Sequence, residues 1–304
     1  MFIKFPEIEN SYQLRHIDFF LEKFPDLENT EFIIESKLDG ANLSMIFSPK
    51  GEIKYYSRNQ IVDTTFYGLT EAIKIYKNEI AIFQKISKDF NQNIQFYFEY
   101  FGKGIQNRIN YGDSKQLRII GLRINDFIQP PQYILHLLEE YNILYMYAPI
   151  IKIVNSLTEA LEINCEFVNK INSDSGDLEE GIVIKPFKKI VQSGNGEIFI
   201  LKKKNPKFAE KMSKKNKETK KISDECSAII ENFIDYITES RMFSVFSKEG
   251  PILEKSQIGK YVKFIFEDAL KDYLKENDSI DDEYMKNVSS TASKLIANML
   301  LKQF

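Results

Sequence analysis

Alternating apolar and polar side chains predict a series of β-strands over the first two thirds of the chain. Two such segments flank "SPKG" at residues 48–51, where proline and glycine occupy the positions that a type I turn favours. Residues 41–58 are therefore predicted to form a β-hairpin. Runs rich in β-branched and aromatic residues predict four more strands, at residues 94–102, 117–126, 179–187 and 197–204.

Helical spacing of apolar residues marks two segments among these strands, residues 70–87 and 131–143. The second segment has proline near its start, where a first helical turn tolerates it. Strands and helices do not alternate in the regular order that a parallel sheet requires. The pattern therefore predicts an α+β fold with mainly antiparallel sheets flanked by helices.

The sequence changes character after Phe208. Residues 202–221 hold ten lysines against two glutamates, and beyond them apolar residues follow helical spacing. We therefore predict a first domain, a lysine-rich linker and a small all-helical C-terminal domain, over residues 1–211, 212–222 and 223–304. For the lysines from Lys207 to Lys221, a solvated linker and a basic strip that contacts a nucleic-acid backbone both stay open.

Composition narrows the class of protein. The 304 residues carry a formal net charge of −3, so any basic surface must be local. The two cysteines, Cys165 and Cys226, are far apart, which argues against a disulfide framework and a cysteine-based zinc site. The isolated His16 and His136 argue against a histidine-ligated metal. No apolar run suits a signal peptide or a membrane span, so a soluble cytoplasmic protein is expected.

Charged residues interrupt several apolar strands of the first domain. Lysine and glutamate are rarely buried without a partner, because desolvation is costly. Lysines that hold phosphate oxygens and carboxylates that hold a divalent cation would explain such charges together, as in a nucleotide site. The chain has neither a P-loop motif nor a GxGxxG motif. The four interrupted stretches are "ESKLDG" (35–40), "FEYFG" (98–102), "EEGIVIKP" (179–186) and "LKKKN" (201–205).

Lys37-Leu38-Asp39-Gly40 resembles motif I, KxDG, of the covalent nucleotidyltransferases, which include ATP-dependent ligases and mRNA capping enzymes. KxDG alone is a weak signal because so short a motif often arises by chance. Four companions follow in the family's order, and five ordered matches are hard to explain by chance. The companions are Ser57-Arg58 (motif Ia), Phe98-Glu99 to Gly102 (motif III), Glu180-Gly181 to Lys185-Pro186 (motif IV) and Lys202-Lys203-Lys204 (motif V).

Within that superfamily the chain looks most like the RNA ligase 2 group, which includes phage RNA ligase 2 and the kinetoplastid RNA-editing ligases. The specific signals are "MFIKFPEIENSY" at the start, "FGKGIQNRINYGD" (101–113) and "KKKNPKFAEK" (202–211). The resemblance implies a nucleotidyltransferase domain followed by an all-helical C-terminal domain. It also implies an enzyme that uses ATP as AMP donor and needs Mg²⁺ or Mn²⁺.

By the same resemblance, Lys37 is the nucleophile that attacks the α-phosphate of ATP and becomes lysyl-AMP. The metal ligand would be Glu180, and Lys203 would point away from the site because strands alternate. Tyr111 could stack on a base, although core packing is the simpler interpretation. The other expected roles are catalytic contacts to phosphate for Lys202 and Lys204, and nucleotide binding for Glu35, Asp39, Asn42, Arg58, Glu99 and Lys185.

The resemblance implies a ligase that joins RNA 3′-OH and 5′-phosphate ends through an RNA-adenylate, with nicked duplex RNA as the expected substrate and no protein partner required. A small DNA ligase and a non-catalytic RNA-binding relative stay open. One departure favours the latter. The group's motif IIIa has an aromatic residue that stacks on adenine and then an acidic residue, whereas this chain has Ile119, Ile120 and Gly121.

Overall fold

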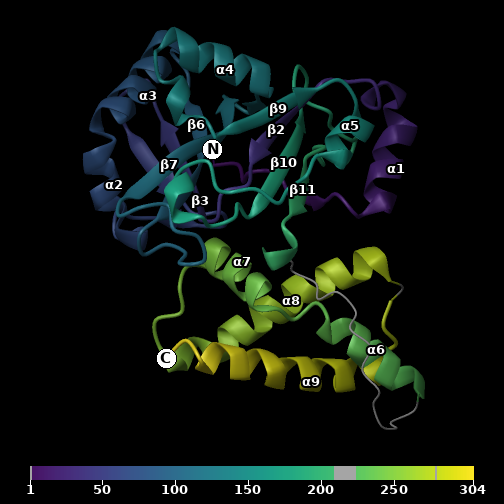
Figure 1. The fold of residues 1–304 in the computed structure, drawn as a ribbon. Coiled ribbons are helices and arrows are strands. Elements are labelled where there is room, and N and C mark those ends of the chain that lie inside the picture. The colour runs from purple at the N-terminus through teal and green to yellow at the C-terminus, as the bar shows by residue number, and fades with distance from the viewer. Residues whose placement is uncertain (1, 209–223, 278) are drawn as a thin grey trace. The chain divides into compact units, whose positions relative to one another are not determined.

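The computed structural model describes residues 2–208, 224–277 and 279–304, which divide into two compact units (Figure 1). The N-terminal unit comprises Met1–Lys207 and contains both β-sheets. The C-terminal unit comprises Phe208–Phe304, and its described residues form helices and the segments that connect them. This architecture confirms the predicted α+β class with mainly antiparallel sheets and a helical C-terminal domain.

Sheet A combines strands from the beginning, middle and end of the N-terminal unit. Its order is β1-β11-β10-β2-β9, and each neighbouring pair is antiparallel except β1 with β11. The last strand of the unit therefore lies inside the sheet, between the first strand and β10. The bounds are β1 Glu9–Asn10, β2 Phe32–Ser36, β9 Ile150–Val154, β10 Gly181–Pro186 and β11 Leu201–Lys204.

Sheet B has the order β5-β4-β3-β6-β7-β8, with each neighbouring pair antiparallel. The hairpin predicted over residues 41–58 is confirmed by the pairing of β3 with β4. The segment predicted as a strand over 197–204 is shorter in the structure, because only its last four residues form β11. The bounds of sheet B are β3 Ala41–Phe47, β4 Ile53–Tyr56, β5 Ile61–Val62, β6 Ile94–Gly102, β7 Lys115–Ile124 and β8 Phe127–Ile128.

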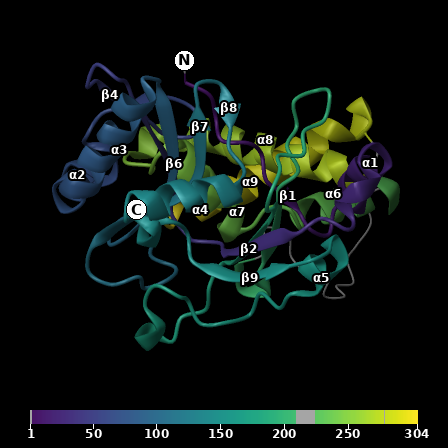
Figure 2. The same ribbon diagram turned by 90° about the horizontal axis from the view of Figure 1, so that it is seen from above.

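Helices cover the outer face of each sheet (Figures 1 and 2). The helices α1 and α5 contribute Phe20 and Leu157 to a core against sheet A, whereas α2, α3 and α4 contribute side chains such as Phe83 to a core against sheet B. The bounds are α1 Leu14–Lys23, α2 Leu69–Ile75, α3 Lys77–Phe90, α4 Pro131–Glu140 and α5 Leu157–Glu162.

The single helix predicted over residues 70–87 is wrong, because the structure has two helices that meet at Tyr76. The backbone of Tyr76 leaves the helical region, with φ −96° and ψ 27°. Its hydroxyl accepts a hydrogen bond from the N–H of Leu117 at 3.3 Å. The break lets α2 pack on β7 while α3 packs on β3.

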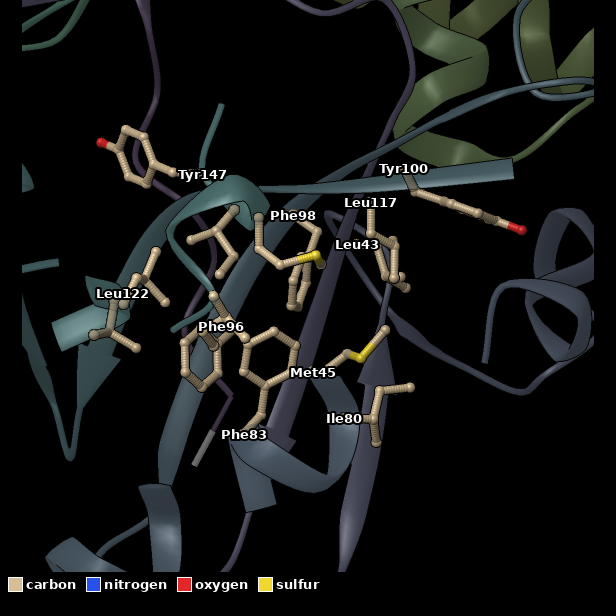
Figure 3. Packing of buried hydrophobic residues seen from close by; sticks show 14 of the residues in the cluster. Leu43, Met45, Ile80, Phe83, Phe96, Phe98, Tyr100, Leu117, Leu122 and Tyr147 are labelled. Carbon is tan, nitrogen blue, oxygen red and sulfur yellow. The ribbon is translucent and has the colours of Figure 1, made fainter. Parts of the chain in front are cut away.

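Strand alternation separates an apolar outer face from an inner face in each sheet. In sheet B, Met45, Phe96 and Phe98 point outward into the core beneath α3, where they surround Phe83 (Figure 3). In sheet A, Ile34 and Ile184 point outward into the core beneath α1 and α5. The residues between them in sequence therefore lie on the two inner faces.

The inner faces of the two sheets meet in a smaller apolar cluster. Val183 of β10, Ile200 just before β11 and Tyr97 of β6 belong to this cluster, and Phe5 from the N-terminal segment completes it. Glu35, Lys185, Lys202 and Lys204 lie on the inner face of sheet A, because each follows or precedes an outward-facing residue of its strand. The charged stretches of the sequence are thus gathered between the two sheets.

The C-terminal unit packs its helices around one apolar core that includes Phe233, Ile265 and Ile296. A buried arginine, Arg241, donates to the Tyr236 carbonyl at 2.8 Å and to Asp272 at 2.9 Å, which ties α7 to α8. No helix in the described part of the chain is both long and apolar enough to cross a bilayer. The bounds are α6 Asp224–Ile234, α7 Glu239–Glu249, α8 Ile258–Glu276 and α9 Asp282–Leu301.

The predicted linker over residues 212–222 lies outside the described residues, so the boundaries predicted for the three parts remain predictions. The same holds for the lysines between Lys211 and Lys221. The structure instead separates its two units at Lys207 and Phe208.

The aromatic core beneath α3 should dominate the stability of the N-terminal unit. Phe83 is fully buried and packs against Phe47, Phe96 and Phe98. Phe83→Ala should cost about 3 to 5 kcal/mol of unfolding free energy through lost burial and the cavity left behind. Urea unfolding followed by circular dichroism measures this. Phe127→Ala, at a ring that is 75% exposed, is the control and should change it by less than about 0.5 kcal/mol.

Candidate active site

The connection from β2 to β3 places Lys37 between the inner faces of the two sheets. The Lys37 N–H donates to the Gly181 carbonyl of β10 at 3.0 Å. Gly40 passes so close to β6 that a Cβ atom there would lie 2.3 Å from the Tyr100 carbonyl oxygen. The KxDG turn is therefore fixed against sheet A at its beginning and against sheet B at its end.

Glu180 is the centre of the charge cluster around Lys37. The Lys37 Nζ donates to Glu180 Oε2 at 2.6 Å, the Lys204 Nζ lies 2.9 Å from Oε1, and the Arg108 Nη2 lies 3.9 Å from Oε1. Burial alone would raise the pKa of Glu180. The three cations, Lys204 foremost, outweigh burial and lower that pKa to about 2. Glu180 is thus an ionised carboxylate that is shared among cations.

Asp39 is a second buried carboxylate in the cluster, and Arg108 forms a bidentate ion pair with it. The Arg108 Nε donates to Asp39 Oδ2 at 2.9 Å, and the Nη2 donates to Oδ1. Burial and the nearby charge of Glu180 raise the pKa of Asp39, whereas Arg108 and Lys37 oppose the rise. The residue that follows the candidate nucleophile by two positions therefore depends on Arg108 for its main compensating charge.

Tyr111 and Glu179 form the next layer behind the KxDG turn. The Tyr111 hydroxyl accepts the backbone N–H of Asp39 at 2.9 Å and donates to Glu179 Oε1 at 3.3 Å. Glu179 Oε2 accepts the N–H of Lys170 at 3.1 Å, and burial raises the pKa of Glu179 to about 7. Of the two adjacent glutamates, Glu180 therefore faces Lys37, whereas Glu179 supports the turn from behind.

Glu35 and Lys185 form a separate buried pair on the same inner face of sheet A. The Lys185 Nζ donates to Glu35 Oε2 at 2.6 Å and to the Ile120 carbonyl at 2.8 Å. The Tyr147 hydroxyl donates to Glu35 Oε1 at 2.5 Å. Both charges are more than nine-tenths buried, so this pair links β2, β10 and β7 at the inner end of the site.

Glu99 and Asn42 face each other across β6 and β3 of sheet B. Burial raises the pKa of Glu99 to about 8, and Glu180 and Asp39 add to the rise while Lys37 opposes it. The Glu99 carboxyl is therefore largely protonated at neutral pH. The buried Asn42 Oδ1 has no hydrogen-bond partner within the described part of the chain. Both groups are polar and lie on the inner face of sheet B.

The remaining predicted residues lie on two other segments. Arg58 lies in the turn between β4 and β5. Lys202 lies on β11 opposite Val183, and alternation places it on the same face as Lys204. Lys203 points away, as predicted, because its Nζ donates to the Leu161 and Ile163 carbonyls at 2.8 and 2.9 Å.

The altered motif IIIa is accommodated by an aromatic residue from elsewhere. Ile119 points into the outer core, whereas the Ile120 carbonyl accepts from Lys185. A Cβ atom on Gly121 would lie 2.6 Å from the ring of Phe5, so the absent side chain makes room for that ring. Phe5 thus occupies apolar space next to Ile120 on the inner face.

A divalent cation would find a limited set of protein ligands here. Across residues 2–208, 224–277 and 279–304, no three or more His, Cys, Asp or Glu side chains converge as a metal site. Glu180 could hold such a cation because it is ionised. Its present partners are side-chain cations, and phosphate groups of a bound nucleotide could attract them away from Glu180. Mg²⁺ characteristically uses one or two carboxylates together with substrate phosphates.

Sequence reasoning assigned no site role to Arg108, Glu179 or Tyr147, and for Tyr111 it offered only stacking on a base. All four contact predicted site residues. Tyr111 is buried and hydrogen-bonded rather than available for stacking on a base. The available signal was "FGKGIQNRINYGD", which the resemblance singled out without assigning roles to its members. Its arginine and tyrosine both reach Asp39.

Two family models match the chain. The model described as RNA ligase matches residues 30–204, which is more than half of the chain and includes Lys37 through Lys204. The model described as T4 RNA ligase 2 C-terminal matches residues 219–303. Among curated proteins, none matches the chain in sequence.

Solved structures of the Naegleria gruberi RNA ligase resemble this one. The complex with PPi is 15% identical, covers 68% of this chain and 57% of that chain, and has a TM-score of 0.51. A mutant with ATP and Mn is 16% identical, with coverages of 68% and 57% and a TM-score of 0.51. An apo mutant is 16% identical, with coverages of 66% and 55% and a TM-score of 0.51.

These structures show a shared fold, and the chain spans a little over half the length of the relative that they represent. The two family models together account for both units of this chain. The chain therefore belongs to the RNA ligase family and carries a C-terminal domain of the T4 RNA ligase 2 type.

Proposed function

We propose that this protein is an ATP-dependent RNA ligase that joins RNA 3′-OH and 5′-phosphate ends through a Lys37-AMP intermediate. The observation that carries the proposal is the Lys37 amine, held 2.6 Å from the ionised Glu180 with Lys204 and Arg108 beside it. Family membership supports RNA as the substrate. The ATP and Mn bound to a structural relative support the nucleotide and the metal.

In the first step, the lone pair of the deprotonated Lys37 amine forms a bond to the α-phosphorus of ATP. The bond from that phosphorus to the bridging oxygen breaks, and pyrophosphate leaves with the electron pair. Glu180 accepts a hydrogen bond from the amine and thereby orients it. Because its pKa is about 2, Glu180 suits orientation and cation binding rather than storage of the proton, which passes to solvent.

We assign the surrounding groups to the charge and shape of the nucleotide. Lys202, Lys204 and Arg58 would bind phosphate oxygens. Glu99 would contact the ribose, and Asn42 would help to orient the reacting groups. The Glu35–Lys185 pair would support the pocket, and Asp39 would hold the KxDG turn. Glu180 would hold Mg²⁺ or Mn²⁺, which when bound supplies positive charge against the phosphates.

In the second step, a 5′-phosphate oxygen of RNA attacks the Lys37-bound phosphorus, and the Lys37 nitrogen leaves and regains its proton. In the third step, the RNA 3′-OH attacks the 5′-phosphorus, its proton passes to solvent and AMP leaves. A nick in duplex RNA suits this sequence of steps because the duplex holds both ends together. RNA-adenylate is the intermediate between the two transfers.

Covalent labelling tests the nucleophile. Incubation with α-labelled ATP and Mg²⁺ should label the wild-type protein, and Lys37→Ala should reduce labelling by about 100-fold or more because the attacking nitrogen is gone. Lys54→Ala is the matched control, since Lys54 is an exposed lysine on a strand of the same unit, and it should keep full labelling. Undiminished labelling of Lys37→Ala would exclude this nucleophile.

The adjacent glutamates offer a matched pair of substitutions. Glu180→Gln should reduce labelling by about 100-fold or more, because it removes the charge that orients Lys37 and holds the metal. Glu179→Gln should lose much less labelling, because Glu179 faces Tyr111 and the Lys170 N–H rather than Lys37. Its amide oxygen can still accept one of those two hydrogen bonds. The rate of labelling at saturating ATP is measured for both. A larger loss in Glu179→Gln would reverse the roles assigned to the two glutamates.

Substrate preference tests the RNA assignment separately from the chemistry of Lys37. Duplex nicks with an RNA 3′-OH strand should be sealed at least about 10-fold faster than all-DNA nicks, because the 2′-OH distinguishes RNA from DNA. Gel analysis of sealed and adenylated strands measures this. Equal or faster sealing of DNA would favour a DNA ligase, and labelling without sealing of any strand would confine the activity to nucleotide transfer.

A further inference from the structure

The connection between β6 and β7, residues 103–114, grips the KxDG turn at two points. Arg108 binds the Asp39 carboxylate through two nitrogen atoms, and the Tyr111 hydroxyl accepts the Asp39 backbone N–H at 2.9 Å. Both contacts fall on a residue only two positions from Lys37. Sequence reasoning and the proposed chemistry leave Arg108 without a role.

This connection is itself firmly attached to the protein. Ile105, Ile109 and Tyr111 are buried. The Asn110 N–H donates to Asp177 at 2.8 Å, and the Gln116 side chain donates to the Tyr111 carbonyl at 2.8 Å. Because buried side chains and hydrogen bonds hold this connection in place, the Arg108 side chain that it carries also has a fixed position.

Arginine suits this place better than lysine. Its guanidinium presents several N–H groups in a rigid planar fork, and it stays charged under all physiological conditions. The Lys37 amine, by contrast, must lose its positive charge before its nitrogen attacks phosphorus, so its ion pair with Glu180 ends before the bond forms. Arg108 lies 3.9 Å from the same carboxylate and keeps its charge throughout.

Building on the adenylyl transfer assigned to Lys37 above, we propose that Arg108 is the positioning residue of that reaction. Its fork holds Asp39 and thereby the turn that carries Lys37, and its second contact keeps Glu180 turned toward the amine. Lys37 is thus fixed on one side by its N–H to Gly181 and on the other by the Arg108–Asp39 pair.

If Arg108 only positions Lys37, its loss should lower the rate of Lys37 adenylylation but leave the affinity for ATP nearly unchanged. The Arg108 Nε and Nη2 are directed at Asp39, and the nucleotide contacts proposed above are assigned to other residues. Removing the fork should allow the amine to depart from its line of attack, and a misplacement of about 1 Å can cost about 100-fold in rate. The affinity for ATP should change little.

Single-turnover labelling with α-labelled ATP, measured across ATP concentrations, tests this in the full-length chain. Arg108→Ala should lower the rate at saturating ATP by about 10- to 100-fold, with the half-saturating ATP concentration within about 3-fold of wild type. Arg108→Lys should not restore the rate, since a lysine cannot form the fork. Lys103→Ala, which removes an exposed cation from the same connection, should behave as wild type.

The pair itself is tested by a double-mutant cycle. Asp39→Asn should slow labelling to a similar extent, and Arg108→Ala with Asp39→Asn should be no slower than the slower single variant, because both changes break one interaction. Losses that multiply in the double variant would overturn the proposal. So would an unchanged rate in Arg108→Ala, or weaker ATP binding at an unchanged maximal rate.

Two further comparisons distinguish a folding defect from the loss of positioning. Circular dichroism should show native Arg108→Ala, and if that variant does not fold, Arg108→Gln, which retains one donor to Asp39, takes its place in the cycle with the same expectations. Wild-type protein without any label would overturn the proposed function and this proposal with it. Labelled wild type with an equally fast Arg108 variant would overturn the positioning role alone.

Discussion

The arrangement of the N-terminal unit depends on the ion pair between Lys37 and Glu180, which lies between its two sheets. A buried carboxylate is costly unless cations compensate its charge, and here Glu180 is shared among three cations from separate segments. Two sheets with apolar outer faces and charged inner faces meet this requirement. The helices cover the apolar faces, and the charges are left to neutralise one another between the sheets.

Much of this arrangement was accessible from sequence because it depends on local pattern. Alternation together with the turn signal "SPKG" predicted the hairpin of β3 and β4. Alternation also placed Lys203 opposite in direction to Lys202 and Lys204. Ordered motifs predicted that Lys37 and Glu180 belong to one site. Those inferences need only the two-residue period of strands and the order of short motifs, both of which can be read without knowledge of tertiary contacts.

Other features depended on contacts that no local pattern encodes. Arg108 and Tyr111 are separated from Asp39 by about seventy residues, and their roles follow from the path of one connection across the site. The break at Tyr76 likewise reflects packing of α2 and α3 on different strands, which helical spacing cannot distinguish from one long helix. The packing of the Phe5 ring against Gly121 is another long-range contact that no local pattern encodes.

The position of β11 has a consequence for how the protein is made. This strand carries Lys202 and Lys204, yet it pairs with β1 from the first residues of the chain and with β10. Such distant pairing raises contact order and delays folding. During translation, the five strands of sheet A cannot all pair until residue 204 has emerged from the ribosome. A chain that ends before residue 201 would therefore lack both lysines and the strand that lies between β1 and β10.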